Sequence, residues 1–166
     1  MHTSIYQRDI ITNIIIVGNY QKAEKLYSKL LKRVRAKLGE NDPSTLATMM
    51  NLAITYDHQG KHRDAEVLHK QCLDKRKVGL GESHPSTLET MNNLANTYNH
   101  QGRYRDAEVL YKQCLAKMKV LHGESHPDTI TTMNNLAGTY DRQGRYSDAE
   151  VLFLSLIHIS EPTRPY

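Results

Sequence analysis

The chain has 166 residues, a formal net charge of +4 and 39% hydrophobic residues, enough for one domain-sized core. No apolar run approaches the ~20 residues of a membrane-spanning helix, and no basic start with a cleavage site marks a secretory signal. The two cysteines, Cys72 and Cys114, are therefore expected to be reduced thiols in a cytoplasmic protein.

The sequence repeats with a period of 42 residues. Pro43, Pro85 and Pro127 are 42 positions apart, and residues 43–84 and 85–126 share 31 identities in 42 positions. A fixed period in this range predicts an array of equivalent structural units. We assign four repeats, the first degenerate and the last truncated, to residues 1–42, 43–84, 85–126 and 127–153.

Each repeat opens with the pattern of an amphipathic helix. In the third repeat, apolar residues recur at steps of three and four, and they are Leu88, Met91, Leu94, Ala95 and Tyr98. Proline stands at the start of this pattern and glycine at its end, positions that each residue favours. These patterns predict first helices over 3–17, 45–59, 87–101 and 129–143.

A second helical pattern follows in each repeat. In the third repeat it comprises Ala107, Leu110, Tyr111, Cys114, Leu115 and Met118, of which the small residues allow a close approach to the first helix. A lone hairpin cannot bury both apolar stripes, so the hairpins are expected to stack. The pattern predicts second helices over 20–37, 62–78, 104–120 and from about residue 146.

These repeats resemble tetratricopeptide repeats. Leu94-Ala95-x-x-Tyr98, then Ala107-x-x-x-Tyr111, then Pro127, match the pattern of that family. Methionine replaces its first aromatic residue, alanine replaces its glycine, and the period is 42 rather than about 34. The surplus falls after Leu115, so it should lengthen the second helix and the loop that follows. This long variant, with MNNLA in the first helix, is similar to the repeats of kinesin light chains; nephrocystin-type and nucleotide-binding regulatory proteins carry similar arrays.

The resemblance implies an all-α fold, a right-handed superhelical solenoid of stacked antiparallel helical hairpins with about 3.5 repeats. It also implies a scaffold rather than an enzyme, one that binds a protein or peptide partner in its concave groove. A kinesin light chain-like protein would link cargo to the kinesin heavy chain and would be cytoplasmic and cytoskeleton-associated. The alternative is a sensor or regulatory segment of a larger nucleotide-binding signalling protein.

Asparagines recur in the middle of the first helices, where this residue has poor helix propensity. Asn51, Asn93 and Asn135 are 42 residues apart and flank the apolar stripe. An amide has donors and an acceptor, so a ladder of amides can bind the main chain of an extended peptide. Alternatively, these amides bond each other or the next helix and set the stacking. We predict a peptide-binding groove formed by Asn51, Asn92, Asn93, Asn96, Asn134, Asn135, Glu89, Asn99, His100 and Arg142.

Motifs for catalysis, cofactors or metals are not found in the sequence. No phosphate-binding loop, nucleophile elbow or zinc-protease helix occurs. His58 and His62 are four residues apart, but Gly60 places them in different elements, so they do not form a zinc pair on one helix. We therefore expect no catalytic residue, no metal ligand and no cofactor.

The positive charge is concentrated in the first repeat, chiefly at Lys29, Lys32, Arg33, Arg35 and Lys37. Such a helix can meet nucleic acid or an anionic lipid surface. The alternative is a solvated outer face, which we favour because no aromatic residues interleave for base stacking. We expect no nucleic-acid partner and no membrane insertion.

The repeat register ends abruptly after Phe153. Lys-Gln-Cys stands at 70–72 and at 112–114, whereas the fourth repeat has Leu154-Ser155-Leu156. The tail resembles one translated frame of a sequencing-library adapter, and the alternative is a divergent capping helix. We interpret 154–166 as a non-native tail on a fragment of a longer protein.

Overall fold

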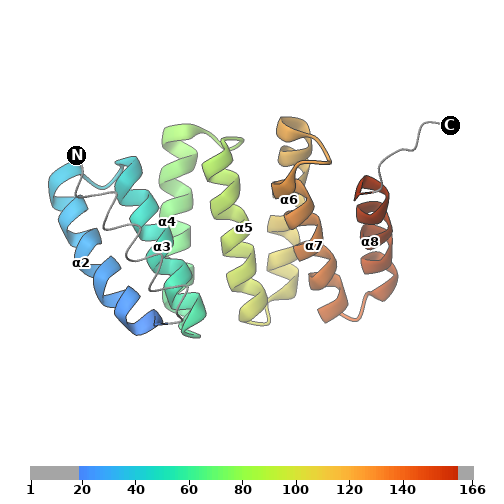
Figure 1. The fold of residues 1–166 in the computed structure, drawn as a ribbon, viewed down its shortest axis with the longest axis horizontal. Coiled ribbons are helices and arrows are strands. Elements are labelled where there is room, and N and C mark those ends of the chain that lie inside the picture. The colour runs from blue at the N-terminus through green and yellow to red at the C-terminus, as the bar shows by residue number, and fades with distance from the viewer. Residues whose placement is uncertain (1–18, 161–166) are drawn as a thin grey trace. The chain divides into compact units, whose positions relative to one another are not determined.

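The computed structural model describes residues 19–160, which form seven α-helices and no β-strand (Figure 1). The helices are α2 (Tyr20–Leu38), α3 (Pro43–His58), α4 (His62–Leu80), α5 (Pro85–His100), α6 (Tyr104–His122), α7 (Pro127–Arg142) and α8 (Tyr146–Ser160). The predicted all-α fold is confirmed, and the predicted helix bounds agree to within two residues. The helix predicted at 3–17 lies outside the described residues. Among the described helices, none combines the length and the apolar character needed to cross a membrane.

Contacts divide the chain into an N-terminal unit that ends at Gly79 and a C-terminal unit that begins at Leu80. In the N-terminal unit, α2 packs on α3. In the C-terminal unit, α5 packs on α6, α6 on α7 and α7 on α8, and α5 also contacts α7. First helices of successive repeats therefore lie against each other in the C-terminal unit, as expected for stacked hairpins.

Side-chain caps start the first helices two residues before the predicted positions. Asp42, His84 and His126 directly precede the prolines, and each side chain accepts a hydrogen bond from the backbone N–H two residues later, at 2.8, 3.1 and 3.2 Å. Such a cap satisfies an N–H that has no partner within the helix. Proline then fits the first helical position, where its missing N–H is not needed.

Glycine ends the first helices, as predicted. Gly102 has a φ of 75°, a left-handed conformation that costs glycine little. Its N–H donates to the Asn99 carbonyl at 3.0 Å, and the next N–H, of Arg103, donates to the Tyr98 carbonyl at 2.9 Å. These two bonds satisfy carbonyls at the helix end and turn the chain into α6.

The second helices absorb the extra length of the 42-residue repeat. Helices α2, α4 and α6 each have 19 residues, whereas α3, α5 and α7 each have 16. The predicted lengthening of the second helix is therefore confirmed.

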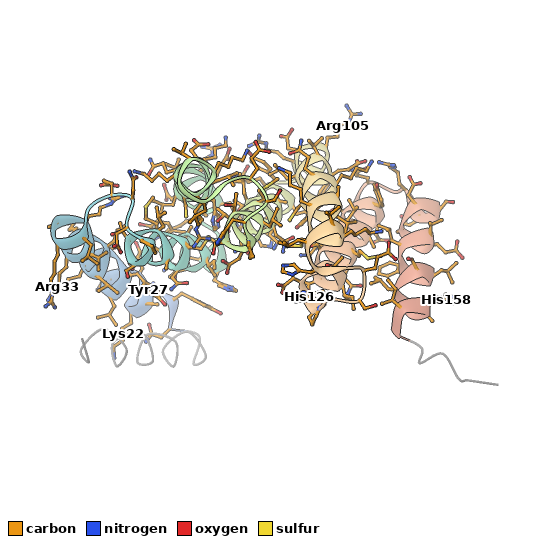
Figure 2. The ribbon with its side chains drawn as sticks, turned by 90° about the horizontal axis from the view of Figure 1, so that it is seen from above. Lys22, Tyr27, Arg33, Arg105, His126 and His158 are labelled. Carbon is orange, nitrogen blue, oxygen red and sulfur yellow. The ribbon has the colours of Figure 1, made fainter. Side chains whose placement is uncertain are left out.

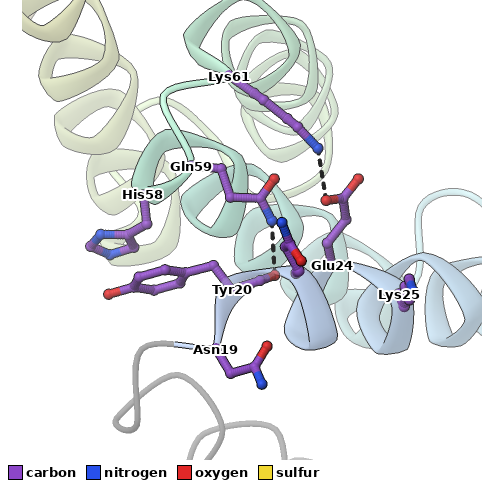
Figure 3. A pocket seen from close by; sticks show the side chains of 8 residues that line it. Asn19, Tyr20, Glu24, Lys25, His58, Gln59 and Lys61 are labelled. Carbon is purple, nitrogen blue, oxygen red and sulfur yellow. Dashed lines mark hydrogen bonds and ion pairs between the residues drawn. The ribbon is translucent and has the colours of Figure 1, made fainter.

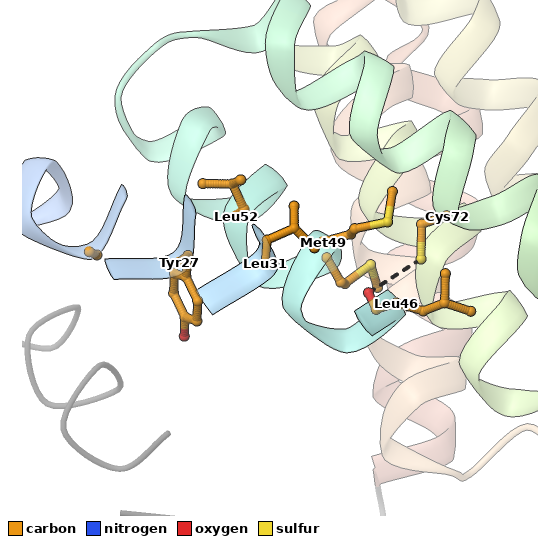
Figure 4. Close-up of a cluster of buried hydrophobic side chains, with 8 residues drawn as sticks. Tyr27, Leu31, Leu46, Met49, Leu52 and Cys72 are labelled. Carbon is orange, nitrogen blue, oxygen red and sulfur yellow. Dashed lines mark hydrogen bonds between the residues drawn. The ribbon is translucent and has the colours of Figure 1, made fainter. Parts of the chain in front are cut away.

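The core of the N-terminal unit joins all three of its described helices (Figure 4). Tyr27 and Leu31 of α2 cluster with Leu46 and Met49 of α3 and with Cys72 of α4. Met49 is fully buried at the position where the family has an aromatic residue, and a flexible thioether can fill such an irregular space. The Cys72 thiol donates to the Leu46 carbonyl at 3.6 Å, which shows how close α4 approaches α3.

The same packing recurs in the C-terminal unit. Leu88 and Met91 of α5, Tyr111 and Cys114 of α6 and Met133 of α7 are all buried. The Cys114 thiol donates to the Leu88 carbonyl at 3.3 Å, and burial raises the pKa of this thiol to about 12. Both cysteines of the chain are free, which confirms the expected absence of a disulfide.

An ion pair joins α6 to the turn after α7, and another joins α2 to the turn after α3. Glu108 of α6 accepts hydrogen bonds from Lys112 at 2.6 Å, from Arg145 at 2.8 Å and from Gln143 at 3.1 Å. One end of the N-terminal unit repeats the pair, with Lys61 donating to Glu24 at 2.8 Å (Figure 3). These contacts fasten one hairpin to the next within each unit.

We expect Glu108 to make stability depend on pH. Burial alone would raise the pKa of its carboxyl, but the hydrogen bonds from Lys112, Gln143 and Arg145 outweigh burial and lower the pKa from 4.5 to about 2. Because the folded pKa lies below the unfolded one, the stabilisation is complete above pH 4.5 and is lost as pH falls toward 2. The donors Lys112 and Arg145 are 53% and 41% exposed, so solvent screening limits the effect to about 1 kcal/mol.

Urea unfolding of the Glu108→Gln variant and the parent chain at several pH values measures this effect. The two free energies of unfolding should differ near pH 6 and converge near pH 2. Glu150 occupies the equivalent position in α8 and is exposed, so Glu150→Gln is the matched control and should leave stability unchanged. An equal effect of the two substitutions at pH 6 would contradict the role of the ion pair.

Helix α8 continues past the point where the repeat register ends. It runs to Ser160, and Leu156 is buried, whereas Phe153, Leu154 and Ile157 are exposed. An apolar sequence can extend a helix whatever its origin. The interpretation of 154–166 as a non-native tail therefore remains a prediction.

Candidate functional site

The predicted groove residues lie on the first helices. Asn51 is on α3 of the N-terminal unit, and all the others are in the C-terminal unit. Helices α5 and α7 carry them in equivalent registers, and because these helices contact each other the structure brings the two sets together. The residues on α5 are Glu89, Asn92, Asn93, Asn96, Asn99 and His100, and those on α7 are Asn134, Asn135 and Arg142.

The three asparagines of the predicted ladder have unused amide groups. Asn51, Asn93 and Asn135 are partly buried, and within the described residues their side chains make no hydrogen bond to the protein. Their backbone carbonyls, in contrast, accept hydrogen bonds from buried threonine hydroxyls one turn later, at 2.7, 3.1 and 2.8 Å. The backbone at each rung is therefore fixed, while the amide is available to another molecule.

A pocket of about 260 Å³ lies beside this ladder in the C-terminal unit. It is lined by Pro85, Glu89, Asn92, Met118, His122, Asp128 and Thr131. The Oδ1 atom of Asn92 is buried and has no hydrogen-bond partner. An enclosed acceptor without a donor is costly, so it marks a place where a ligand or a water can bond.

The second helix α6 contributes to this pocket through Met118 and His122. The sulfur of Met118 accepts a hydrogen bond from Thr132 at 3.3 Å, and His122 stacks on His126 with ring centroids 4.3 Å apart. The pocket thus contains four residues that were not predicted as site residues: Met118, His122, Asp128 and Thr131. The 42-residue period did not indicate them, because it identifies the apolar stripe of each helix but not which helix ends lie together.

Two of the predicted groove residues bond within the unit instead. The Tyr111 hydroxyl donates to Oδ1 of Asn96, and burial raises the pKa of this hydroxyl, which keeps it protonated as a donor. Asn99 is only 7% exposed, and its Nδ2 donates to the Thr139 hydroxyl of α7 at 2.9 Å. These amides connect α5 to α6 and α7, so their geometry matches the stacking alternative.

In the N-terminal unit, ionisable residues occupy the positions that are equivalent to Asn99 and Tyr111 of the C-terminal unit. Asp57 stands 42 residues before Asn99, and His69 stands 42 before Tyr111. The Asp57 carboxylate lies 3.0 Å from Nδ1 of His62 and 3.5 Å from Nε2 of the fully buried His69. Polar side chains at these positions thus connect the first helix to the second in both units.

The remaining predicted residues, Glu89, Asn134, His100 and Arg142, are exposed. Glu89 and Asn134 flank the ladder, whereas His100 and Arg142 lie at the ends of α5 and α7. They form a rim of mixed charge.

Comparison with known proteins identifies the family. The sequence profile described as "Tetratricopeptide repeat" matches residues 10–78, 76–119 and 86–159, well over half of the chain. No curated protein gave a significant sequence match.

Solved structures agree with the profile. A structure of nearly identical TPR-like repeats, from a Podosopora anserina protein described as a kinesin light chain, matches with a TM-score of 0.86 and 25% identity. The match covers 96% of this chain and 76% of that one. A single-substitution variant of that protein gives the same values. BtubC (BKLC) from P. vanneervenii matches with a TM-score of 0.83 and 22% identity, over 95% of this chain and 65% of that one, and shows the fold. The chain belongs to the tetratricopeptide repeat family and has its solenoid fold.

Proposed function

We propose that this chain is a protein-interaction scaffold whose first helices bind an extended segment of a partner protein. Tetratricopeptide repeats generally bind protein partners, and one solved structure with similar repeats comes from a protein described as a kinesin light chain. The proposed role is therefore that of a kinesin light chain-like adaptor in the cytoplasm, which joins a cargo protein to a motor subunit.

One observation carries the proposal: the amides of Asn93 and Asn135 are unused within the described residues, although the helices beneath them are tightly packed. A partly buried amide without a partner is a poor choice for stability alone, since alanine is the better helix former. Two such amides on the contacting helices α5 and α7 can each bond one peptide group of an extended chain.

The neighbouring pocket adds a preference for the partner's side chain. Glu89 and Asp128 bring two carboxylates to its lining, and Asn92 contributes an enclosed acceptor. Three hydrogen-bond acceptors that line a pocket of about 260 Å³ favour a partner side chain with several hydrogen-bond donors, such as arginine or lysine.

The test compares Asn93→Ala, Asn135→Ala and the double variant for partner affinity and thermal stability. The ligand is a peptide selected by display against the parent chain. Each substitution should raise the Kd about 2- to 12-fold, the effect of one net hydrogen bond of about 0.5–1.5 kcal/mol. The double variant should lose the sum of the two binding free energies, because each amide bonds a separate peptide group.

The melting temperature should stay unchanged or rise, since alanine favours the helix. Gln113 is an exposed amide on the second helix α6, outside the predicted groove, so Gln113→Ala serves as the control and should bind like the parent chain. A lower melting temperature with unchanged affinity would assign Asn93 and Asn135 to stacking and would refute the groove.

A further inference from the structure

Helix α2 carries far more positive charge than the other second helices. It has seven Lys or Arg residues and one carboxylate, Glu24, whereas α4 has five and three and α6 has four and two. At the positions of Lys25 and Lys29, both α4 and α6 carry valine and glutamine. The internal repeats thus show that this fold does not require a cation at either position.

Six of these cations form a basic ridge on the surface of α2. Lys25, Lys29, Arg33 and Lys37 follow each other at steps of four residues, which places them in one row along the helix. Lys22 and Lys32 flank this row. All six side chains are exposed, and in the described part of the chain none of them forms an ion pair (Figure 2 labels Lys22 and Arg33).

The ridge works against the stability of its own helix. Like charges three and four residues apart repel each other, and the ridge contains several such pairs. Yet α2 keeps the residues that stack the repeats: Tyr27 is buried, and Glu24 bonds Lys61 at 2.8 Å. The added positive charge of the helix therefore lies on its exposed face, where stability gives no reason for it.

We propose that the basic ridge of α2 binds an extended acidic segment of a partner protein, with carboxylates at alternate residues. A step of four residues along a helix rises about 6.0 Å, and alternate side chains of an extended strand lie about 6.6 Å apart. The two spacings match closely, so successive carboxylates can each meet one cation of the row. From Lys25 to Lys37 the row is about 18 Å long, enough for four such contacts.

The composition of the ridge argues against two other polyanions. Single-stranded nucleic acid is held by aromatic side chains on which its bases stack, and the ridge has none. A membrane-surface helix inserts apolar side chains between lipids, and the six ridge residues include none. This site is separate from the asparagine ladder and is independent of the proposed peptide groove.

Fluorescence anisotropy with a labelled (Glu-Ser)6 peptide tests the ridge on the full chain at low ionic strength. The parent chain should bind this peptide, should not bind (Gln-Ser)6, and should lose affinity as salt screens the charges. Lys25→Val combined with Lys29→Gln installs the residues of α4 and α6, so the helix should fold. This variant should bind about 3- to 10-fold more weakly, because exposed ion pairs each contribute modestly.

The matched control combines Arg63→Gln with Arg105→Gln, two exposed residues on α4 and α6, and changes the net charge by the same amount. It should bind like the parent chain. Equal weakening in both variants would show an effect of net charge alone and would overturn the proposal. Stronger binding to phosphatidylserine vesicles or to single-stranded RNA than to (Glu-Ser)6 would also overturn it, as would the absence of peptide binding.

Discussion

Replacement of Tyr111 by alanine should lower the free energy of unfolding by about 3–5 kcal/mol, the usual cost of deleting a buried aromatic side chain. The Tyr111 ring is completely buried in α6, so its removal leaves a cavity between helices that pack on both sides. The substitution also removes the hydroxyl that donates to Asn96, and Oδ1 of that amide then lacks its donor.

Two further variants separate the parts of this effect in urea unfolding followed by circular dichroism. Tyr111→Phe keeps the ring and should lose only about 1–3 kcal/mol, the cost of leaving a buried partner unpaired. Phe153 occupies the equivalent position in α8 but is 43% exposed, so Phe153→Ala should cost clearly less than Tyr111→Ala. Similar losses for both alanine variants would contradict the central place of Tyr111 in the core.

The sequence was sufficient to predict the helices because the repeats contain the same local signals for the start, the end and the buried face of a helix. Proline marks the first position of a helix and glycine its end, and the apolar residues keep helical spacing between them. Stacking then follows from the two apolar stripes, which one hairpin cannot bury. The caps shifted the starts of the first helices: the side chains of His84 and His126 start these helices earlier than the apolar pattern does.

The roles of individual asparagines could not be predicted in the same way. Asn93 and Asn99 both lie on α5 in polar positions, but one amide is unused within the described residues and the other is buried. The difference depends on Tyr111 and Thr139, which are 12 and 40 residues away from Asn99. A helical period shows which side of a helix a residue occupies, but it does not show what the neighbouring helix offers there.

The pocket beside the ladder was missed for a related reason. It forms where the end of α6 meets the starts of α5 and α7, and its lining residues belong to no single stripe. Its unpaired acceptor, Oδ1 of Asn92, is visible only when all the surrounding atoms are placed. Sequence patterns therefore predict which face of the first helices carries the asparagines, but not the depth or the charge of the pocket beside them.

Asn99→Ala should distinguish the two roles that asparagine has in this chain. The substitution removes the donor to Thr139 and leaves buried polar groups of α6 and α7 with fewer partners, so we expect a loss of about 1–3 kcal/mol of stability. Partner affinity should be unchanged, the reverse of the result expected for Asn93→Ala.

Asp141 is the equivalent residue of α7 and is exposed, so Asp141→Ala is the control and should be close to neutral. A double-mutant cycle of Asn99→Ala with Thr139→Val should give a coupling of about 0.5–3 kcal/mol, because the two side chains bond each other directly. Unchanged stability together with weaker peptide binding would instead place Asn99 in the groove, as the sequence alone predicted.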